Sequence, residues 1–382
     1  MKGRLNLVTG GFGFTGIHVA RALIDRGERV LLTDLSASLD DPDRRRLAET
    51  LGLDLGHAHL ECIPSNLLEI SSLQALAAKP ITRVFHTASL YDYSAPLEVL
   101  MRVNVEGTRN LLAALESLPL ERFVHWSTCG VFGKPYTARD GAKVNLPFNE
   151  ASSSPKHARP DDEGPDGTHL VNAYSVSKWV QEKLVWRAHR EEGLPLTVVR
   201  PAPIYGPGSS YGHGGLMLAI AQGWLPGIPS DAKNYITASV HVEDVAEFAV
   251  YSADDPAALG EDYNIVDNSI ISFDEFLRFI ALLTGRRLRS VPLLRLRQMR
   301  PLFIAAAQAW TFLERRFKVP RPRVFEIQSS TYVSSSYWLS NRKSLATGYA
   351  YLYPDVREGL KDTVAWFRQQ GWLNARERLF TS

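Results

Sequence analysis

Three glycines near the start of the chain limit what it can fold into more than any other feature of the sequence. Gly10, Gly13 and Gly16 follow the apolar run Leu5–Thr9 and precede a helical pattern that continues to about Arg26. A strand–turn–helix unit needs glycine where the chain turns tightly, where the backbone approaches a phosphate, and where the helix packs on the strand. A glycine triplet alone is weak evidence, but its position between a strand and a helix predicts a pyrophosphate-binding loop. The predicted cofactor-binding residues of this loop are Gly10, Gly13, Phe14, Thr15 and Gly16.

Short β-branched runs alternate with helical patterns along the first half of the chain. The predicted strands cover 29–33, 83–86, 122–127 and 196–200, and the longest helical patterns cover 97–118 and 171–192. Strands that alternate with helices form right-handed βαβ units, which build a parallel sheet covered on both faces. We therefore predict an α/β fold with a doubly wound parallel sheet of the Rossmann type.

Two structural units are expected within this chain. Residues 1–200, together with a return of the chain at about 236–267, should form an NAD(P)-binding Rossmann domain. Residues 201–235 and 268–382 should form a smaller substrate-binding lobe, because the chain is mostly helical in pattern from Ser272 onward. The segment 137–169 is rich in Pro, Gly, Ser and Asp, and is expected to be a long loop; such loops are usually functional or mobile.

Composition excludes several classes of protein. In 382 residues, 43 Lys and Arg against 41 Asp and Glu give a net charge of +2, which argues against a protein that tracks nucleic-acid phosphates. The two cysteines, Cys62 and Cys129, are too few for a disulfide framework or a zinc cluster, so no metal is expected. The sequence has no signal-peptide pattern and no apolar run of the roughly 20 residues that span a bilayer. A cytoplasmic location is therefore expected.

The residue that ends the second predicted strand indicates which dinucleotide binds. Asp34 lies 24 residues after Gly10, where a carboxylate can accept hydrogen bonds from the adenosine ribose and repel a 2′-phosphate. This favours NAD over NADP. The alternative is a turn or helix cap, since Ser36 and Ser38 follow. Arg44, Arg45 and Arg46 lie further along and can soften the preference, so NADP stays open.

A tyrosine and a lysine supply the expected chemistry. Tyr174 and Lys178 are four residues apart in a helical pattern, so they share one face of the helix. A nearby ammonium favours the phenolate, and the pair can then exchange a proton with an alcohol or carbonyl while hydride moves. A surface helix pair would give the same spacing, but the glycine loop on the same sheet favours catalysis. Ser127 and Thr128 end a predicted strand, where a hydroxyl can polarise the substrate oxygen, and Thr128 is the stronger candidate.

The ordered motifs of the chain resemble those of one superfamily. They are TGGFGFTG (9–16), VFHTAS (84–89), NVEGTRNLL (104–112), WSTCGVFG (126–133), YSVSK (174–178), RPAPIYGPG (200–208) and VHVEDVA (240–246). The chain thus resembles the extended short-chain dehydrogenase/reductase superfamily, which includes nucleotide-sugar epimerases and dehydratases and 3β-hydroxysteroid dehydrogenases. The resemblance covers about residues 5–270, and the pattern of the C-terminal part is similar to the 3β-hydroxysteroid dehydrogenase branch.

This resemblance implies a role for each matching residue. Tyr174 would be the catalytic acid/base, Lys178 its partner and a ligand of the nicotinamide ribose, and Thr128 the catalytic hydroxyl. Asn66 and Leu67 stand where the family often has Asp-Leu beside the adenine, a departure that an Asn side chain can tolerate. The remaining implied cofactor contacts are Ala88, Ser89, Asn104, Ser127, Pro201 and Ile204. The family also suggests a homodimer through the helices at 97–118 and 171–192.

The segment 286–323 suggests the kind of substrate. It holds eleven basic residues against one acidic residue, Glu314, and it contains an apolar run at 301–313. Such a run can line an apolar pocket and rest on a membrane surface, with arginines facing anionic headgroups. The alternative is a helix that packs on the core with a solvated basic face. Peripheral membrane contact through 286–323 is expected if the apolar run faces a pocket or a lipid surface, and not if it packs on the core.

Three functions stay open at this point. The leading one is an NAD(P)-dependent oxidoreductase that transfers hydride to or from a hydroxyl or keto carbon of a hydrophobic small molecule, such as a sterol or a long-chain keto acid. The second is a nucleotide-sugar epimerase or dehydratase with tightly bound NAD. The third is a non-catalytic NAD(P)-sensing protein, which the complete set of Tyr174, Lys178 and Thr128 argues against. Nucleic acid is not an expected partner.

Overall fold

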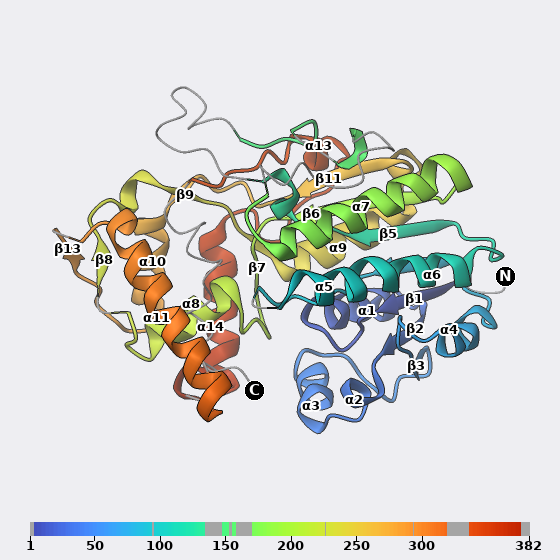
Figure 1. Ribbon diagram of the computed structural model, residues 1–382, viewed down its shortest axis with the longest axis horizontal. Helices are drawn as coiled ribbons and strands as arrows, with labels where there is room; N and C mark the ends of the chain where they lie inside the picture. Colours follow the sequence, from blue (N-terminus) through green and yellow to red (C-terminus); the bar gives the residue numbers. More distant parts are fainter. Residues whose placement is uncertain are drawn as a thin grey trace.

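The computed structural model is built around a seven-stranded sheet in which every neighbouring pair of strands is parallel (Figure 1). The structure describes residues 4–93, 95–133, 147–152, 155–157, 170–225, 227–292, 294–318 and 336–375. The strand order is β11-β6-β5-β4-β1-β2-β3, so the chain winds outward in both directions from β1. This architecture confirms the predicted doubly wound parallel sheet.

The strands of this sheet are short and mostly buried. Leu7 and Val8 are neighbours on β1, yet they belong to apolar cores on opposite faces of the sheet. Burial on both faces explains why most of these strands carry adjacent apolar residues instead of a strict apolar–polar alternation. The strands are β1 Leu5–Thr9, β2 Arg29–Asp34, β3 Leu60–Pro64, β4 Arg83–His86, β5 Arg122–Trp126, β6 Leu196–Pro201 and β11 Glu261–Ile265.

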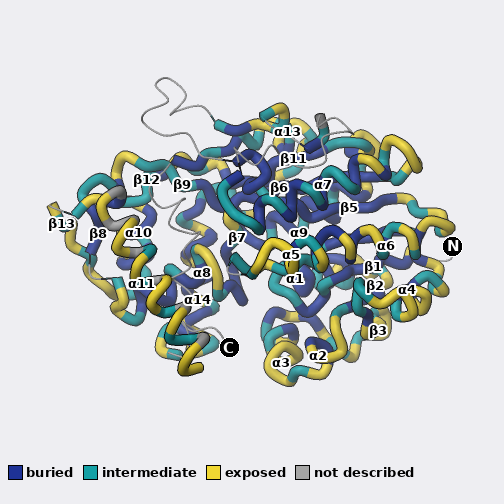
Figure 2. Tube along the Cα trace, in the orientation of Figure 1, coloured by how far each residue is buried: buried dark blue, intermediate teal, exposed yellow. Residues whose placement is uncertain are grey.

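Helices cover both faces of the sheet (Figure 1). Leu73, Leu111 and Val185, from α4, α6 and α7, pack on one face, whereas Ile17 and Val245, from α1 and α9, pack on the other. Figure 2 shows most of the sheet as buried, whereas the edge strand β3 and many residues of these helices are intermediate or exposed. The helices are α1 Phe14–Asp25, α2 Ser36–Leu39, α3 Pro42–Thr50, α4 Ile70–Ala77, α5 Leu97–Leu100, α6 Gly107–Leu115, α7 Ala173–Glu192 and α9 Val242–Asp254, with short helical turns η1 Met101–Glu106, η2 Cys129–Phe132, η4 Pro155–His157 and η6 Pro256–Ala258.

The helix predicted over 97–118 is not uniform. The chain runs from α5 through a π-helical turn, η1, into α6. The wider turn brings Asn104 inward, where it is fully buried and bonded to the backbone of Leu90. Turns of this type are frequent at functional sites. The homodimer expected through this helix and α7 stays a prediction, because the structure is that of one chain.

A second apolar core lies at the side of the sheet, in a helical lobe formed by α8, α10, α11 and α14 (Figure 1). Ser272 and Glu275 form a reciprocal capping box that fixes the start of α10. The lobe elements are α8 Gly212–Ala221, α10 Phe273–Leu283, α11 Leu296–Phe317, α14 Val356–Gln369, the turns η5 Ala232–Asn234 and η8 Trp372–Asn374, and the strands β7 Ile204–Tyr205, β8 Ile228–Pro229, β9 Ile236–Thr237, β10 Val240–His241, β12 Ile271–Ser272 and β13 Ser290–Val291. The short helix α13 Arg342–Ala346 instead packs against β11 of the seven-stranded sheet. The domain boundaries expected from the sequence stay a prediction.

Two further expectations from the sequence concern the long loop at 137–169 and the lack of a segment that could span a bilayer. The expected loop at 137–169 lies mostly outside the described residues; within it the structure describes 147–152 and 155–157, which include the short helical turn η4. Within the described residues, every helix is too short or too polar to pass through a lipid bilayer.

Candidate active site

The glycine loop has the shape that a dinucleotide pyrophosphate requires. Gly10 has a φ of +65°, and a Cβ placed there would lie 2.8 Å from the Cα of Ala88. A Cβ on Gly16 would lie 2.2 Å from the carbonyl oxygen of Gly10, so only glycine lets α1 pack this closely on the loop. Gly13 is the N-cap of α1, and no side chain caps that helix end. The backbone N–H groups at this helix end are therefore free of a side-chain cap, as phosphate binding requires.

Asp34 lies at the end of β2, beside the glycine loop. Its Oδ2 accepts a hydrogen bond from the N–H of Phe12 at 3.0 Å, and its Oδ1 accepts one from the N–H of Leu35 at 2.8 Å. The N-cap of α2 is Leu35, so Asp34 does not cap that helix. Arg44 and Arg45 are engaged within their own region, with Asp41 and with the carbonyl of Leu39. This arrangement fits a ribose-binding carboxylate.

The residues expected beside the adenine follow β3. Asn66 accepts a hydrogen bond from the N–H of Leu68 and donates one to Glu69, so its side chain stabilises the turn before α4. The carbonyl of Leu67 accepts a hydrogen bond from Asn110 on α6, at 3.0 Å. The adenine contacts of Asn66 and Leu67 stay predictions.

Tyr174 and Lys178 occupy the first turns of α7. The Asn172 side chain caps this helix by accepting a hydrogen bond from the N–H of Ser175 at 2.7 Å. Lys178 is buried, and its Nζ donates to the carbonyl of Trp126 at 2.6 Å and to Ser89 Oγ at 3.2 Å. Burial lowers the pKa of Lys178 to about 7, against the opposing effect of Glu182. The lysine therefore lies between the carboxyl ends of β4 and β5, close to the glycine loop.

The two candidate hydroxyls after β5 have different surroundings. Thr128 is partly exposed and caps η2, accepting a hydrogen bond from the N–H of Gly130 at 3.1 Å. Ser127 is buried and donates to Glu182 Oε2 at 2.5 Å, so its hydroxyl is engaged in the interior. Because η2 packs against α7, Thr128 lies on the same side of the sheet as Tyr174. These contacts favour Thr128 as the catalytic hydroxyl, and a cofactor contact by Ser127 stays a prediction.

The other residues implied by the resemblance surround the same edge of the sheet. Ala88 lies against Gly10, and Ser89 contacts Lys178. Asn104 bonds Leu90 and also donates to Ser177 Oγ on α7 at 3.0 Å, so it links the loop after β4 to the helix that carries Tyr174 and Lys178. Pro201 ends β6 and Ile204 begins β7. Their contacts with a nicotinamide stay predictions.

Aromatic residues that the sequence reasoning missed surround Tyr174. The rings of Tyr91 and Tyr93 meet the Tyr174 ring edge-on, with centroid distances of 5.0 and 5.5 Å. Tyr211, the N-cap of α8, contacts Tyr91 at 5.9 Å from the side of the lobe. The signal was present in the sequence, since Tyr91 and Tyr93 follow the fourth strand, where ligand-facing residues of parallel sheets lie.

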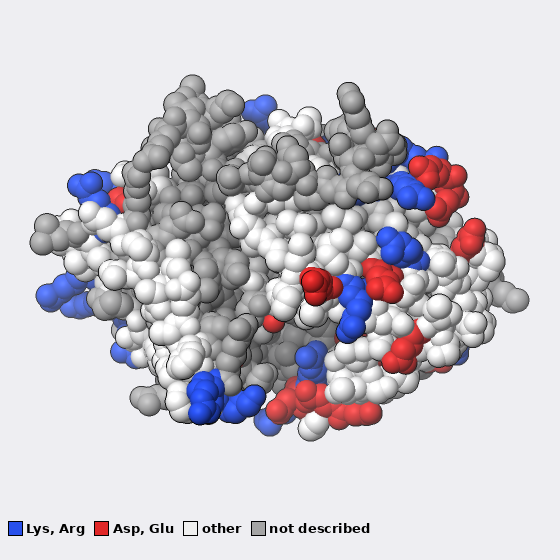
Figure 3. Space-filling model, viewed as in Figure 1, with Lys and Arg blue, Asp and Glu red and all other residues white. Residues whose placement is uncertain are grey.

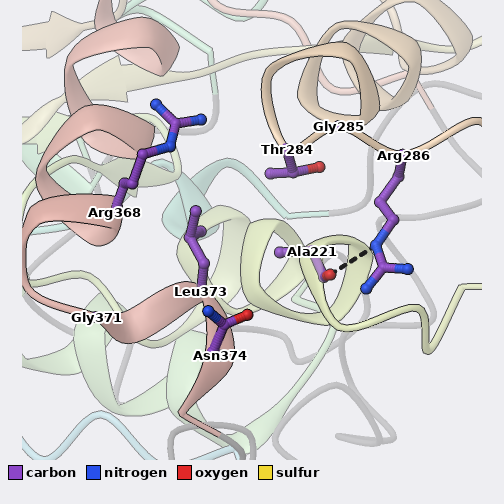
Figure 4. A pocket seen from close by; sticks show the side chains of 8 residues that line it. All are labelled: Ala221, Thr284, Gly285, Arg286, Arg368, Gly371, Leu373 and Asn374. Atoms are coloured by element: carbon purple, nitrogen blue, oxygen red, sulfur yellow. Dashed lines mark hydrogen bonds between the residues drawn. The ribbon is translucent and has the colours of Figure 1, made fainter.

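A separate cavity of about 340 Å³ lies in the helical lobe (Figure 4). Its two arginines cap helix ends: Arg286 donates to the carbonyl of Ala221 at the end of α8, and Arg368 donates to that of Leu283 at the end of α10. Cations at helix C-termini are stabilising. These arginines therefore have a structural explanation, and Tyr174 is not among the residues that line this cavity.

The sequence is similar to several known proteins. The model of the NAD dependent epimerase/dehydratase family matches residues 6–266. A 3β-hydroxysteroid dehydrogenase/Δ5→4-isomerase of Mycobacterium tuberculosis is 24% identical over 374 residues, which cover 94% of this chain and 90% of that protein. A UDP-N-acetyl-α-D-glucosaminuronate decarboxylase of Bacillus cytotoxicus is 26% identical over 380 residues, covering 95% of this chain and 97% of that protein.

A solved structure shares the fold. The dTDP-glucose 4,6-dehydratase of Streptomyces venezuelae with NAD bound has a TM-score of 0.67 and 20% identity, and the match covers 96% of this chain and 98% of that one. At this identity the likeness is evidence for the fold alone.

Proposed function

Since this chain belongs to the NAD-dependent epimerase/dehydratase family, we propose that it transfers hydride between NAD and a hydroxyl or keto carbon of a hydrophobic small molecule. The family assignment confirms the predicted superfamily, and with it an enzyme of the extended short-chain dehydrogenase type. The observation that carries the proposal is the buried Lys178, which lies four residues after Tyr174 on α7 and is bonded to the ends of β4 and β5.

The residues of this chain have distinct roles in the proposed reaction. Bound NAD would supply the acceptor for the hydride of the carbon that carries the substrate hydroxyl. Tyr174 removes the hydroxyl proton at its phenolic oxygen, and Lys178 favours the phenolate through its charge. Thr128 orients the substrate oxygen with its hydroxyl. The glycine loop and Asp34 hold the pyrophosphate and the ribose.

The surroundings of Tyr174 support a hydrophobic substrate. Tyr91 and Tyr93 place aromatic rings against the phenol that would exchange the proton, and Tyr211 extends this aromatic group through its contact with Tyr91. Apolar and aromatic walls with few polar groups are typical of sites for apolar ligands. The name of the mycobacterial relative adds weight to a sterol-like molecule. A long-chain keto acid would meet the same walls.

A nucleotide-sugar epimerase or dehydratase is the second candidate. The Bacillus relative carries a nucleotide-sugar name and matches nearly the whole chain. The two candidates differ in what happens to the cofactor, because an epimerase keeps its NAD bound through each turnover. The test is to incubate the protein with NAD and a 3β-hydroxysteroid, and separately with UDP-glucose. Release of NADH with the steroid supports the proposal, whereas isomerisation of the sugar without NADH release supports the second candidate.

The preference for NAD is proposed from Asp34. Replacement by alanine removes the charge that repels a 2′-phosphate, so Asp34→Ala should weaken NAD binding and improve NADP binding relative to it, by roughly tenfold in the ratio. Fluorescence titration of both cofactors measures the ratio of dissociation constants. Asp54→Ala, a change on an exposed carboxylate that accepts a hydrogen bond from the nearby Gly56 N–H, is the control. A wild-type protein that already prefers NADP would contradict this proposal.

We also propose peripheral contact with an anionic membrane through α11. Leu302, Ala305, Ala309 and Phe312 recur at helical spacing and are exposed, and the exposed fractions of Leu302 and Phe312 are 69% and 63%. The area over α11 is mostly uncharged in Figure 3, with Lys and Arg side chains at its lower end. Exposed Arg316 and Lys318 follow this apolar stripe at the end of α11. An apolar helix face bordered by cations is typical of binding in the plane of an anionic interface.

Phe312→Glu should abolish most of this membrane binding. The change places a charge in the apolar stripe, so co-sedimentation with vesicles of phosphatidylserine and phosphatidylcholine should fall about tenfold. Wild-type binding should also fall as salt is raised. Ile270→Glu, on a residue that is 65% exposed outside α11, is the matched control and should bind like the wild type. Equal sedimentation of the Phe312 and Ile270 variants, or no sedimentation of the wild type, would contradict membrane contact.

A further inference from the structure

A buried chain of polar side chains runs beneath the candidate site and ends on Lys178. Gln181, one turn further along α7, is fully buried, and its Oε1 accepts a hydrogen bond from Lys178 Nζ at 2.5 Å. Its Nε2 donates to Thr108 Oγ1 on α6 at 2.8 Å. The same hydroxyl lies 2.8 Å from His86 Nε2 on β4, and His86 Nδ1 lies 2.8 Å from Thr9 Oγ1 on β1.

The donor and acceptor in each of these hydrogen bonds follow from the other bonds that the same side chains make. Thr108 has one hydroxyl proton, which it donates to the carbonyl of Asn104 at 2.6 Å. The hydroxyl must therefore accept from both Gln181 and His86, so His86 carries its proton on Nε2. Burial lowers the pKa of His86 to about 3, which agrees with a neutral ring. Because the Thr108 hydroxyl proton is used on Asn104, Thr108 can only accept from the Gln181 amide. The Gln181 Nε2 must therefore face Thr108, which leaves the amide oxygen toward Lys178.

We propose that Gln181 is a positioning residue, which holds the amine of Lys178 in place through an amide whose orientation is set by Thr108 and His86. A glutamine supplies an acceptor without adding a negative charge. The hydrogen bond anchors the amine and favours its protonated form, without the stronger effect that a carboxylate at this position would have. This inference rests on the proposed function only for the catalytic role of Lys178.

The charged and titratable groups around Lys178 come from three elements. Tyr174 and Glu182 lie on α7, His86 lies on β4, and His125 lies on β5. Burial holds the pKa values of both histidines below their ordinary range, so these rings stay neutral near pH 7. Glu182 raises the pKa of Lys178, and burial lowers it more strongly. Loss of the acceptor at position 181 should therefore lower the pKa of Lys178, whereas an added carboxylate there should raise it.

The test is to titrate Lys178 in the cofactor-free protein by NMR, with lysine labelled with carbon-13 at Cε. The Lys178 signal is identified by its loss in Lys178→Met. Gln181→Met removes the acceptor and should lower the midpoint by roughly 1–2 pH units, whereas Gln181→Glu should raise it by a similar amount. Gln308→Glu, which adds the same charge at an exposed position of α11, should leave the midpoint unchanged.

A second pair of variants covers the case in which the Gln181 variants do not fold. Thr108→Val removes the acceptor that orients the amide and should lower the Lys178 midpoint, whereas Thr108→Ser keeps the hydroxyl and should behave like the wild type. Shifts in the same direction for Gln181→Met and Gln181→Glu, or no shift in either, would overturn the proposal. If the Gln181 variants do not fold, a Lys178 midpoint in Thr108→Val equal to that of the wild type would also overturn the proposal. None of these readings needs turnover, so they are independent of the proposed reaction.

Discussion

The Tyr174→Phe enzyme should lose turnover by about 10²–10⁴-fold while binding NAD nearly as well as the wild type. The phenylalanine ring keeps the edge contacts with Tyr91 and Tyr93 but lacks the oxygen that exchanges the proton. Initial rates of NADH formation with a 3β-hydroxysteroid measure the first quantity, and fluorescence titration with NAD measures the second.

The matched control is Tyr251→Phe. Tyr251 lies on α9, and its hydroxyl donates to the carbonyl of Thr347, so the variant loses one tyrosine hydroxyl far along the chain from α7. Its turnover should equal that of the wild type. A Tyr174→Phe enzyme that turns over as fast as Tyr251→Phe would show that Tyr174 is not the acid/base.

Glu182→Gln should lower the free energy of unfolding by about 3–5 kcal/mol. Glu182 and Arg200 are both fully buried, and their closest ion-pair atoms are 2.5 Å apart. Arg200 also pairs with buried Asp262 at 2.6 Å, and Lys343 reaches Asp262 at 2.9 Å. Removal of one carboxylate leaves a buried cluster with an uncompensated positive charge. Urea unfolding followed by circular dichroism measures the loss.

The same helix offers an exposed pair for comparison. Glu191 and Arg187 are four residues apart on α7, with their ionic atoms at 2.9 Å, and both side chains are largely in solvent. Glu191→Gln should cost only about 0.3–0.5 kcal/mol. Similar losses for Glu182→Gln and Glu191→Gln would mean that the buried cluster is not the stabilising unit that its burial indicates.

The parallel sheet could be predicted from the sequence because its strands are buried on both faces. β1, β4 and β6 contain the adjacent apolar pairs Leu7-Val8, Val84-Phe85 and Val198-Val199, and the glycine loop marked the junction between the first strand and the first helix. The strand β11 was not predicted as such, because its sequence, Glu261–Ile265, includes Asp262 and Asn264. Asp262 is satisfied there by Arg200 and Lys343, which are distant in sequence. Such tertiary pairing leaves no local pattern.

The candidate site was predictable only where helix spacing or a turn fixed the geometry. Tyr174 and Lys178 share a helix face, so their proximity followed from four-residue spacing. The engagement of Ser127 by Glu182 and of Lys178 by Gln181 depends on how α7 packs against the sheet. The π-helical turn that brings Asn104 inward likewise leaves no mark in the apolar periodicity.

The most direct measurement of hydride transfer uses an isotope. The protein is incubated with NAD and a 3β-hydroxysteroid that carries deuterium on the hydroxyl-bearing carbon, and the NADH in solution is analysed by mass spectrometry. Direct transfer predicts that the released NADH contains the deuterium and that Tyr174→Phe produces almost none. Unlabelled NADH, or no released NADH while the protein isomerises UDP-glucose with NAD retained, would contradict the proposed reaction.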